Sequence, residues 1–363
     1  MHRPRKGRRR LRAPGFLASG PWRVRAVAVV CAVLAGVASF AAIWGVAAQE
    51  VTFFRIGTGS TAGTYFPIGG IIASAISKPY GSRDCDVGGS CGVPGLIAVA
   101  QSTRGSVDNV VGIAEGRFES GFSQADISYW AYKGEGIFAA RGPVQNLRTI
   151  ANLFPESVHV VVRRDSGFTS LADLRGKRVS IDREGSGTRV DALLLLKAYG
   201  IGLKDFEPVG VAVGDAADML RKGEIDAFIM VVGTPATAVA DLARDALVTL
   251  LPIVGPEAEA LREAYPFFAD DFIPAGTYID VPATETLSVG AQWLVSANVP
   301  EKLVYAITKA LWDPSTRRLL DAGHPKGKRI KLSTALDGLV VPLHAGARRY
   351  YGEAGVPFPA STN

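Results

Sequence analysis

The chain has 363 residues, of which 40 are basic and 34 acidic, and its formal net charge is +6. Nine of the basic residues and none of the acidic ones lie within residues 1–48; removing them leaves 31 basic and 34 acidic side chains, a charge of −3. The basic excess is therefore confined to the N-terminal segment, and it gives no support for a nucleic-acid-binding surface.

Residues 1–48 have the composition of a targeting segment. A basic start is followed by an apolar run from Ala26 to Ala48. With the small residues Val46 and Ala48, this pattern predicts an export signal cleaved after Ala48. The run is also long enough to cross a bilayer, so an uncleaved anchor is the alternative. Both forms place the rest of the chain outside the cytoplasm, in the periplasm or an equivalent compartment.

The rest of the chain alternates short apolar runs with amphipathic segments. In the first part of the chain, we expect a strand at 51–59, helices at 65–78 and 105–118, a strand and exit loop within 120–127, and strands at 147–154 and 158–164. We then expect a short helix and a strand within 170–182, a helix at 187–201, and a helix and a strand within 215–231. The last expected elements are two strands within 277–297 and a helix at 300–312. This alternation predicts an α/β fold with largely parallel sheets. The 315 residues after the N-terminal segment exceed one ordinary core and fit two lobes.

The familiar enzyme motifs fit poorly. The segment "GTGSTAG" can be aligned with a dinucleotide fingerprint, but Asp84, at the required distance, lies in a polar loop rather than at a strand end. The segment "REGSGT" around Ser186 lacks the glycine that a nucleophile elbow needs two residues before the serine. His159, His324 and His344 show no metal-ligand spacing. We therefore expect no enzyme, cofactor or metal, and an exported hydrolase with a dispersed triad is the weaker alternative.

Two glycine-rich segments share one design. "IGTGSTAGTY" (residues 56–65) and "SIDREGSGTRVDALL" (residues 180–194) both read as strand, Gly/Ser/Thr loop and helix. Such loops place hydroxyl and N–H groups at helix N-termini, where the helix dipole favours anions. Each hydroxyl can instead be a plain helix cap. Two such loops, one in each lobe, favour a two-sided cleft for an anionic ligand.

Several longer stretches, taken in chain order, form a recognisable set: "IGTGSTAGTYFPIGGIIA", "GFSQADISYWAYKGEGIF", "GSGTRVDALLLLKAYGI", "LRKGEIDAFIMVVGTPATAVADLA" and "VPLHAGARRYYGEAGV". In these stretches and in their order, the chain resembles the TAXI solute receptors of TRAP transporters. The resemblance implies a two-lobe, type II-like periplasmic binding protein fold. It also implies a monomer that captures a small organic anion, such as a glutamate-like amino acid or a dicarboxylate, and delivers it to a TRAP membrane permease driven by an ion gradient. A receptor that senses its ligand for a membrane signalling partner is the alternative.

The resemblance also implies pocket positions. They are Gly59, Ser60, Thr64 and Tyr65 on the first loop, Gln124 and Asp126 after a short strand, Ser186, Gly187 and Thr188 on the second loop, Thr234 and Pro235, and Tyr278 on the return to the first lobe. The expected parts are residues 1–48 as signal or anchor, 49–160 and 272–363 as lobe 1, and 161–271 as lobe 2.

One stretch departs from the family. Residues 82–101 form an insertion-like segment that contains Cys85 and Cys91. In an oxidising compartment two cysteines this close predict a disulfide that closes a short loop. We expect this loop at the rim of the cleft, where it would influence the identity of the ligand.

Overall fold

The computed structural model describes residues 51–358. The strands are β1 Thr52–Gly57, β2 Ser77–Lys78, β3 Val93–Pro94, β4 Leu96–Gln101, β5 Ser120–Gln124, β6 Leu147–Arg163, β7 Arg178–Ser180, β8 Glu207–Val209, β9 Ala227–Val232, β10 Val248–Leu251, β11 Ala269–Ile273 and β12 Thr284–Ser296. The α-helices are α2 Tyr65–Ile76, α3 Ser106–Ala114, α4 Ala125–Lys133, α5 Gly187–Ala198, α6 Val213–Lys222, α7 Thr237–Arg244, α8 Pro256–Ala264, α9 Glu301–Leu311, α10 Pro314–Gly323 and α11 Ala345–Glu353.

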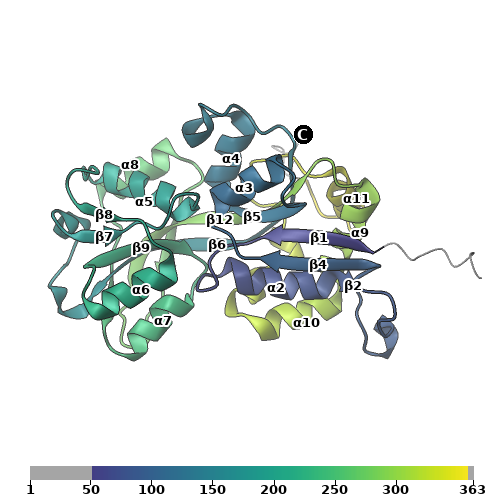
Figure 1. Ribbon diagram of the computed structural model, residues 1–363, viewed down its shortest axis with the longest axis horizontal. Coiled ribbons are helices and arrows are strands. Elements are labelled where there is room, and N and C mark those ends of the chain that lie inside the picture. The colour runs from purple at the N-terminus through teal and green to yellow at the C-terminus, as the bar shows by residue number, and fades with distance from the viewer. Residues whose placement is uncertain (1–50, 359–363) are drawn as a thin grey trace, which may run out of the picture. The chain divides into compact units, whose positions relative to one another are not determined.

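The sheet is mixed rather than largely parallel. Its order is β4-β1-β5-β12-β6-β9-β7-β8, with β10 and β11 paired to β6 and β12. Strands β4, β1 and β5 (the β1 group) run parallel to one another, and so do β9, β7 and β8 (the β7 group). Strands β12 and β6 lie between the two groups and run antiparallel to their neighbours (Figure 1). The predicted α/β class is confirmed, with two parallel groups joined by two long antiparallel strands.

Strands β6 and β12 correct the sequence analysis, which placed two strands in each region. The apparent break in β6 was Pro155, but this residue pairs with Gly290 inside one 17-residue strand. The ladder shifts register between Ala291 and Gln292, next to the proline, and such irregularities accommodate a residue without an N–H group. The segment before Thr284 is a loop, so β12 is also a single strand. A third correction is α4, which begins at Ala125 where an exit loop was expected.

The hydrophobic core separates into two halves along the sheet. In the first half, α2, α9, α10 and α11 cover one face of the β1 group and α3 and α4 the other (Figure 1). In the second half, α5 and α8 pack on one face and α6 and α7 on the other. Alternate residues of β6 serve the two faces, since Val160 packs with α5 while Val161 packs with α6 and α7.

The chain crosses between the halves within β6 and β12. Leu287 and Val289 of β12 pack in the second half, while Ala291 and Trp293 pack in the first. The preceding segment, including Tyr278, also packs with α6 and α7 of the second half. The proposed two-lobe division therefore has its return crossing inside β12, later than the boundary at residue 272 that the sequence suggested.

The cysteine loop lies at the wrong edge for a cleft rim. Cys85 and Cys91 form the predicted disulfide, with Cα atoms 4.7 Å apart. The loop leads into the amino end of β4, where Thr52 pairs with Leu96, and Figure 1 shows it beyond β2. The glycine loops leave from the opposite, carboxyl ends of the strands. The expectation of a disulfide-stiffened rim is therefore wrong in its location.

We expect replacement of both Cys85 and Cys91 by serine to reduce stability and leave ligand affinity unchanged. Because the closed loop is short, the loss should be about 2 kcal/mol or less. Chemical denaturation of the variant, followed by calorimetric titration with a ligand that the parent binds, tests both statements. A loss of affinity with unchanged stability would contradict the placement of this loop away from the site.

The expected signal or anchor at residues 1–48, with Cys31, lies outside the described residues. Of the helices between Val51 and Phe358, none combines the length and hydropathy of a membrane span.

Candidate functional site

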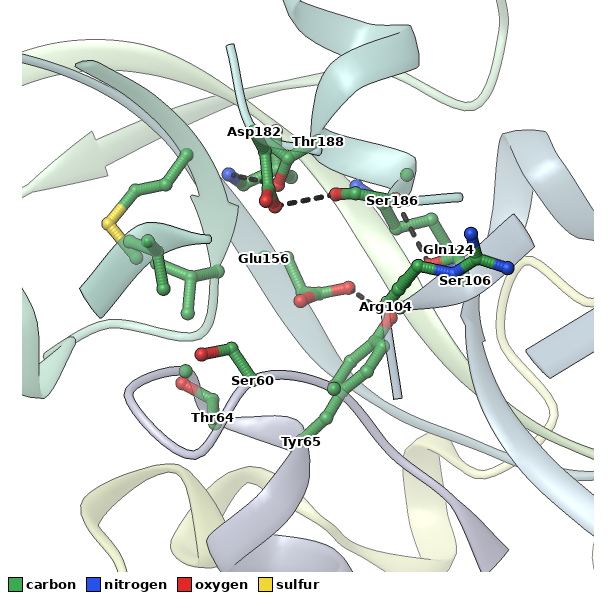
Figure 2. A pocket seen from close by; sticks show the side chains of 18 of the residues that line it. Ser60, Thr64, Tyr65, Arg104, Ser106, Gln124, Glu156, Asp182, Ser186 and Thr188 are labelled. Carbon is green, nitrogen blue, oxygen red and sulfur yellow. Dashed lines mark hydrogen bonds between the residues drawn. The ribbon is translucent and has the colours of Figure 1, made fainter. Parts of the chain in front are cut away.

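A cavity of about 60 Å³ lies between the two halves of the core, at the carboxyl ends of β1, β4 and β7. This is room for roughly four to six water molecules, the scale of a small organic acid. The lining comprises Gly59, Ser60, Gly63, Thr64, Tyr65, Arg104, Gly105, Ser106, Gln124, Glu156, Asp182, Arg183, Ser186, Gly187, Thr188, Val213, Met230, Val231 and Val232. The N-termini of α2, α3 and α5 therefore border one space (Figure 2), and Val213, the first residue of α6, lies in the same lining.

The first glycine loop brings to the cavity two side chains that each donate a hydrogen bond. Thr64 stands immediately before α2 but makes no side-chain cap; its hydroxyl donates to the Gly233 carbonyl, 2.7 Å away in the other half. The Tyr65 hydroxyl donates to Glu156 Oε2 at 2.5 Å. The plain capping interpretation thus fails for Thr64, whose hydroxyl joins the two halves.

The second glycine loop is also not a simple cap. Ser186 precedes α5 without capping it, and its hydroxyl donates to Asp182 Oδ2 at 2.6 Å. Thr188 Oγ1 accepts from the backbone N–H of Val231 at 3.0 Å (Figure 2). The Thr188 proton is left for a further acceptor, because a hydroxyl both accepts and donates. Thr188 therefore anchors α5 to β9 and can donate into the cavity at the same time.

We expect Thr188→Val to reduce both stability and affinity. Valine keeps the shape but leaves the buried Val231 N–H without its acceptor, which costs about 1–3 kcal/mol of unfolding free energy. Loss of the hydroxyl donor to an anionic ligand costs roughly 1.5–3 kcal/mol of binding free energy. Denaturation and titration calorimetry on the same variant separate the two losses. Reduced stability with full affinity would limit Thr188 to an anchoring role.

The sequence analysis predicted the helix that starts near Gly105 but did not place its N-terminus at the site. Gly105 and Ser106 follow β4 as a further strand–Gly–Ser–helix segment, which the search for glycine-rich loops passed over. Gly105 lies against the second loop, since a Cβ built on it would come 3.4 Å from Ser186 Cα. The backbone N–H of Asp108 donates to the Gly185 carbonyl at 3.0 Å. These contacts join the two halves on the α3 side of the cavity.

Gln124 is the side chain that fits most tightly between the halves. Its Oε1 accepts from Ser106 at 3.1 Å, and its Nε2 donates to Asp191 of α5 at 2.6 Å. A Cβ added to Gly187 would lie 1.5 Å from Gln124 Oε1. Glycine at position 187 is therefore required for the close approach of α5 to Gln124.

Acidic and basic groups share the cavity wall. Burial raises the pKa of Glu156 to about 8, against the opposing effect of the Tyr65 hydrogen bond, so this carboxyl is largely protonated at neutral pH. Burial also raises the pKa of Asp182. Arg104 and Arg183 supply cations, and Arg183 reaches across to the Thr103 carbonyl at 2.8 Å. With three helix N-termini added, the wall favours an anion.

Four residues expected in the pocket lie outside its lining. Asp126 is completely buried at the start of α4. Thr234 donates to the Ser157 hydroxyl at 2.8 Å, next to Pro235. Tyr278 Oη accepts from the Ala236 N–H at 2.9 Å and lies 2.9 Å from His159 Nε2.

The histidines take structural positions. Burial lowers the pKa of His159 to about 4, so it is a neutral, packed side chain beside Tyr278. His324 and His344 accept backbone N–H groups at the starts of short helices. No three metal-ligating side chains within residues 51–358 converge to hold a metal ion. Neither serine loop therefore has a histidine base in the described part of the chain.

The sequence analysis missed the charged residues of the wall. Glu156 interrupts a β-branched run in "FPESVHVVV", and a carboxyl inside a buried strand is the signal that could have identified it. Asp182 adopts a φ of 66°. This left-handed conformation turns the chain from β7 into the second loop.

Several solved structures are similar to this chain. The alkanesulfonate-binding protein SsuA from Xanthomonas axonopodis pv. citri, bound to MOPS, matches 85% of each chain at 16% identity and a TM-score of 0.45. PhnD1 from Prochlorococcus marinus with methylphosphonate covers 76% of this chain and 95% of its own, at 12% identity and a TM-score of 0.47. MatC from Rhodopseudomonas palustris with bound malate covers 74% of this chain and 87% of its own, at 14% identity and a TM-score of 0.47.

The match to a protein family covers most of the chain. A family model described as NMT1-like family matches residues 56–355. That range begins in β1 and ends just after α11, so it includes every residue of the cavity wall. This chain belongs to the NMT1-like family.

Proposed function

We propose that this protein is an extracytoplasmic solute receptor that binds a small organic anion between two lobes and delivers it to a membrane permease. The single observation that carries the proposal is the convergence of three helix N-termini from both halves of the core on one small cavity. Helix N-termini bind anions through N–H groups and the helix dipole. A site divided between two lobes makes ligand binding and closure the same event.

The structure contains contacts that can form only when the two halves lie against each other, as in a closed receptor. Thr64 to Gly233, Arg183 to Thr103 and Gln124 to Asp191 each join the first half to the second. A ligand that touches both sides stabilises this arrangement by its differential affinity for it. Opening at a permease would break these contacts and release the ligand.

The ligand class we propose is a glutamate-like amino acid or a dicarboxylate. One carboxylate would lie at the α5 N-terminus, near Ser186, Gly187 and Thr188, with Ser60 on the facing loop. The protonated Glu156 carboxyl would donate to a second ligand oxygen, and its ionised form would accept from an ammonium group. The proposal of a TRAP-type permease rests on the sequence resemblance.

A thermal-shift screen tests the proposal. L-Glutamate, succinate and 2-oxoglutarate are the probes, and succinamide is the uncharged control. A bound probe at 100 times its dissociation constant adds about 2.7 kcal/mol to the unfolding free energy. Stabilisation by an acid but not by the diamide supports an anion receptor. Stabilisation by none of the acids, or equally by the diamide, contradicts it. Uptake into vesicles that contain a TRAP permease then tests delivery.

A further inference from the structure

Two carboxyl groups meet between the halves, beyond the cavity wall. Asp126 on α4 and Asp191 on α5 are 0% and 1% exposed. They are close enough to hydrogen-bond to each other. Among residues 51–358, no side chain donates a well-formed hydrogen bond to either oxygen of Asp126 or to Oδ1 of Asp191; the backbone N–H groups of Asp126 and Ile127 act on the Asp126 carboxyl, and Gln124 satisfies only Asp191 Oδ2. When two buried carboxyl groups share one site, the charge of one opposes ionisation of the other, so the pair favours holding a proton.

We propose that Asp126 and Asp191 form a proton latch: they share one proton when the lobes are closed and release it to solvent when the lobes open. The inference rests on the lobe closure proposed above. In the open form the two carboxyls are hydrated and ionise like ordinary aspartates. The closed form therefore holds one more proton than the open form, and closure is favoured by acid.

The surroundings of the pair support this latch. Burial raises the pKa of Asp126 to about 6. Burial and the charge of Asp126 raise the pKa of Asp191 well above its usual range. The other charges acting on the pair come from Glu156 on β6, which opposes ionisation of Asp191, and from the neighbouring Tyr65 on α2. Lys326, just after α10, faces Glu156 and Asp271.

The consequence is a pH-dependent affinity. Between the pKa of the open pair and that of the closed pair, the closure constant falls by up to tenfold for each unit of rising pH. Asp126→Asn and Asp191→Asn each replace the shared proton with an amide donor of nearly the same shape. These variants remove the contribution of the pair to the pH dependence without leaving a carboxylate unpaired.

Small-angle scattering from the ligand-free protein tests the latch directly. The radius of gyration of the parent should increase from pH 5 to pH 8, and the increase should be clearly smaller in both asparagine variants, since Glu156 still titrates in them. Glu135→Gln, which removes a carboxyl at an exposed position and keeps the pair, is the control, and it should retain the increase. A parent radius that is constant, or variants that expand like the parent, would overturn the latch.

Calorimetry with L-glutamate over the same pH range adds a second readout. The parent affinity should fall with rising pH, and the profiles of both asparagine variants should be flatter. An identical slope in parent and variants would also overturn the latch. If L-glutamate binds to no form while scattering gives the expected result, the proposed ligand is wrong and the latch stands.

Discussion

Replacing Gly187 by alanine is expected to weaken ligand binding at least about 30-fold. The new methyl group would overlap Gln124 Oε1 and lie 2.8 Å from Ser106 Oγ. Gln124 cannot turn aside without losing its hydrogen bonds to Ser106 and Asp191. Overpacking of about 1–3 kcal/mol and two lost hydrogen bonds of about 0.5–1.5 kcal/mol each give about 2–6 kcal/mol. The penalty applies to the closed form, which is the form that holds the ligand.

Two further variants make this test specific. Gly70→Ala lies on α2, where a Cβ meets nothing within 4 Å, and it should preserve affinity while gaining up to about 1 kcal/mol of stability. Adding Gln124→Ala to Gly187→Ala removes the overlap, so the double variant should lose less than the sum of the single losses. Titration calorimetry is carried out on five proteins: the parent, Gly187→Ala, Gln124→Ala, the double variant and Gly70→Ala. Strict additivity would show that Gly187 does not act through Gln124.

Glu156→Gln is expected to remove a large part of the pH dependence of stability. Burial raises the pKa of Glu156 from 4.5 to about 8 in the folded protein. Between these values the folded state holds a proton that the unfolded chain has lost. The unfolding free energy of the parent must therefore fall as pH rises, by about 3–4 kcal/mol between pH 5 and pH 8 from this group alone.

The glutamine variant lacks this titration but keeps an oxygen to accept from Tyr65. Its unfolding free energy should be equal to or lower than that of the parent at pH 5, and higher than that of the parent at pH 8. Urea denaturation at intervals of half a pH unit measures the crossing. Glu135→Gln, at an exposed position, is the matched control and should run parallel to the parent. Parallel profiles for Glu156→Gln and the parent would contradict a protonated, buried Glu156.

The sequence by itself determined the local units of this protein. The strand–loop–helix segments ending at Tyr65 and beginning before Gly187 were predicted because glycines, hydroxyls and helical periodicity act within a few residues. Both loops line the cavity, with Ser60, Thr64, Ser186 and Thr188 in its wall. The Cys85–Cys91 disulfide was equally local, since six positions separate the cysteines.

The tertiary structure alone decided how these units meet. Pro155 suggested a strand end, but pairing with β12 continues β6 through it and carries Glu156 into the cavity. The cysteine loop lies at the amino ends of the strands because β4 pairs in parallel with β1, and this pairing cannot be predicted from the sequence. Asp126 and Asp191 are 65 positions apart, and only the approach of α4 to α5 makes them a buried pair. Short-range patterns fix many local elements, whereas the continuation of a strand through a proline, burial, pKa shifts and a shared site arise from contacts between distant segments.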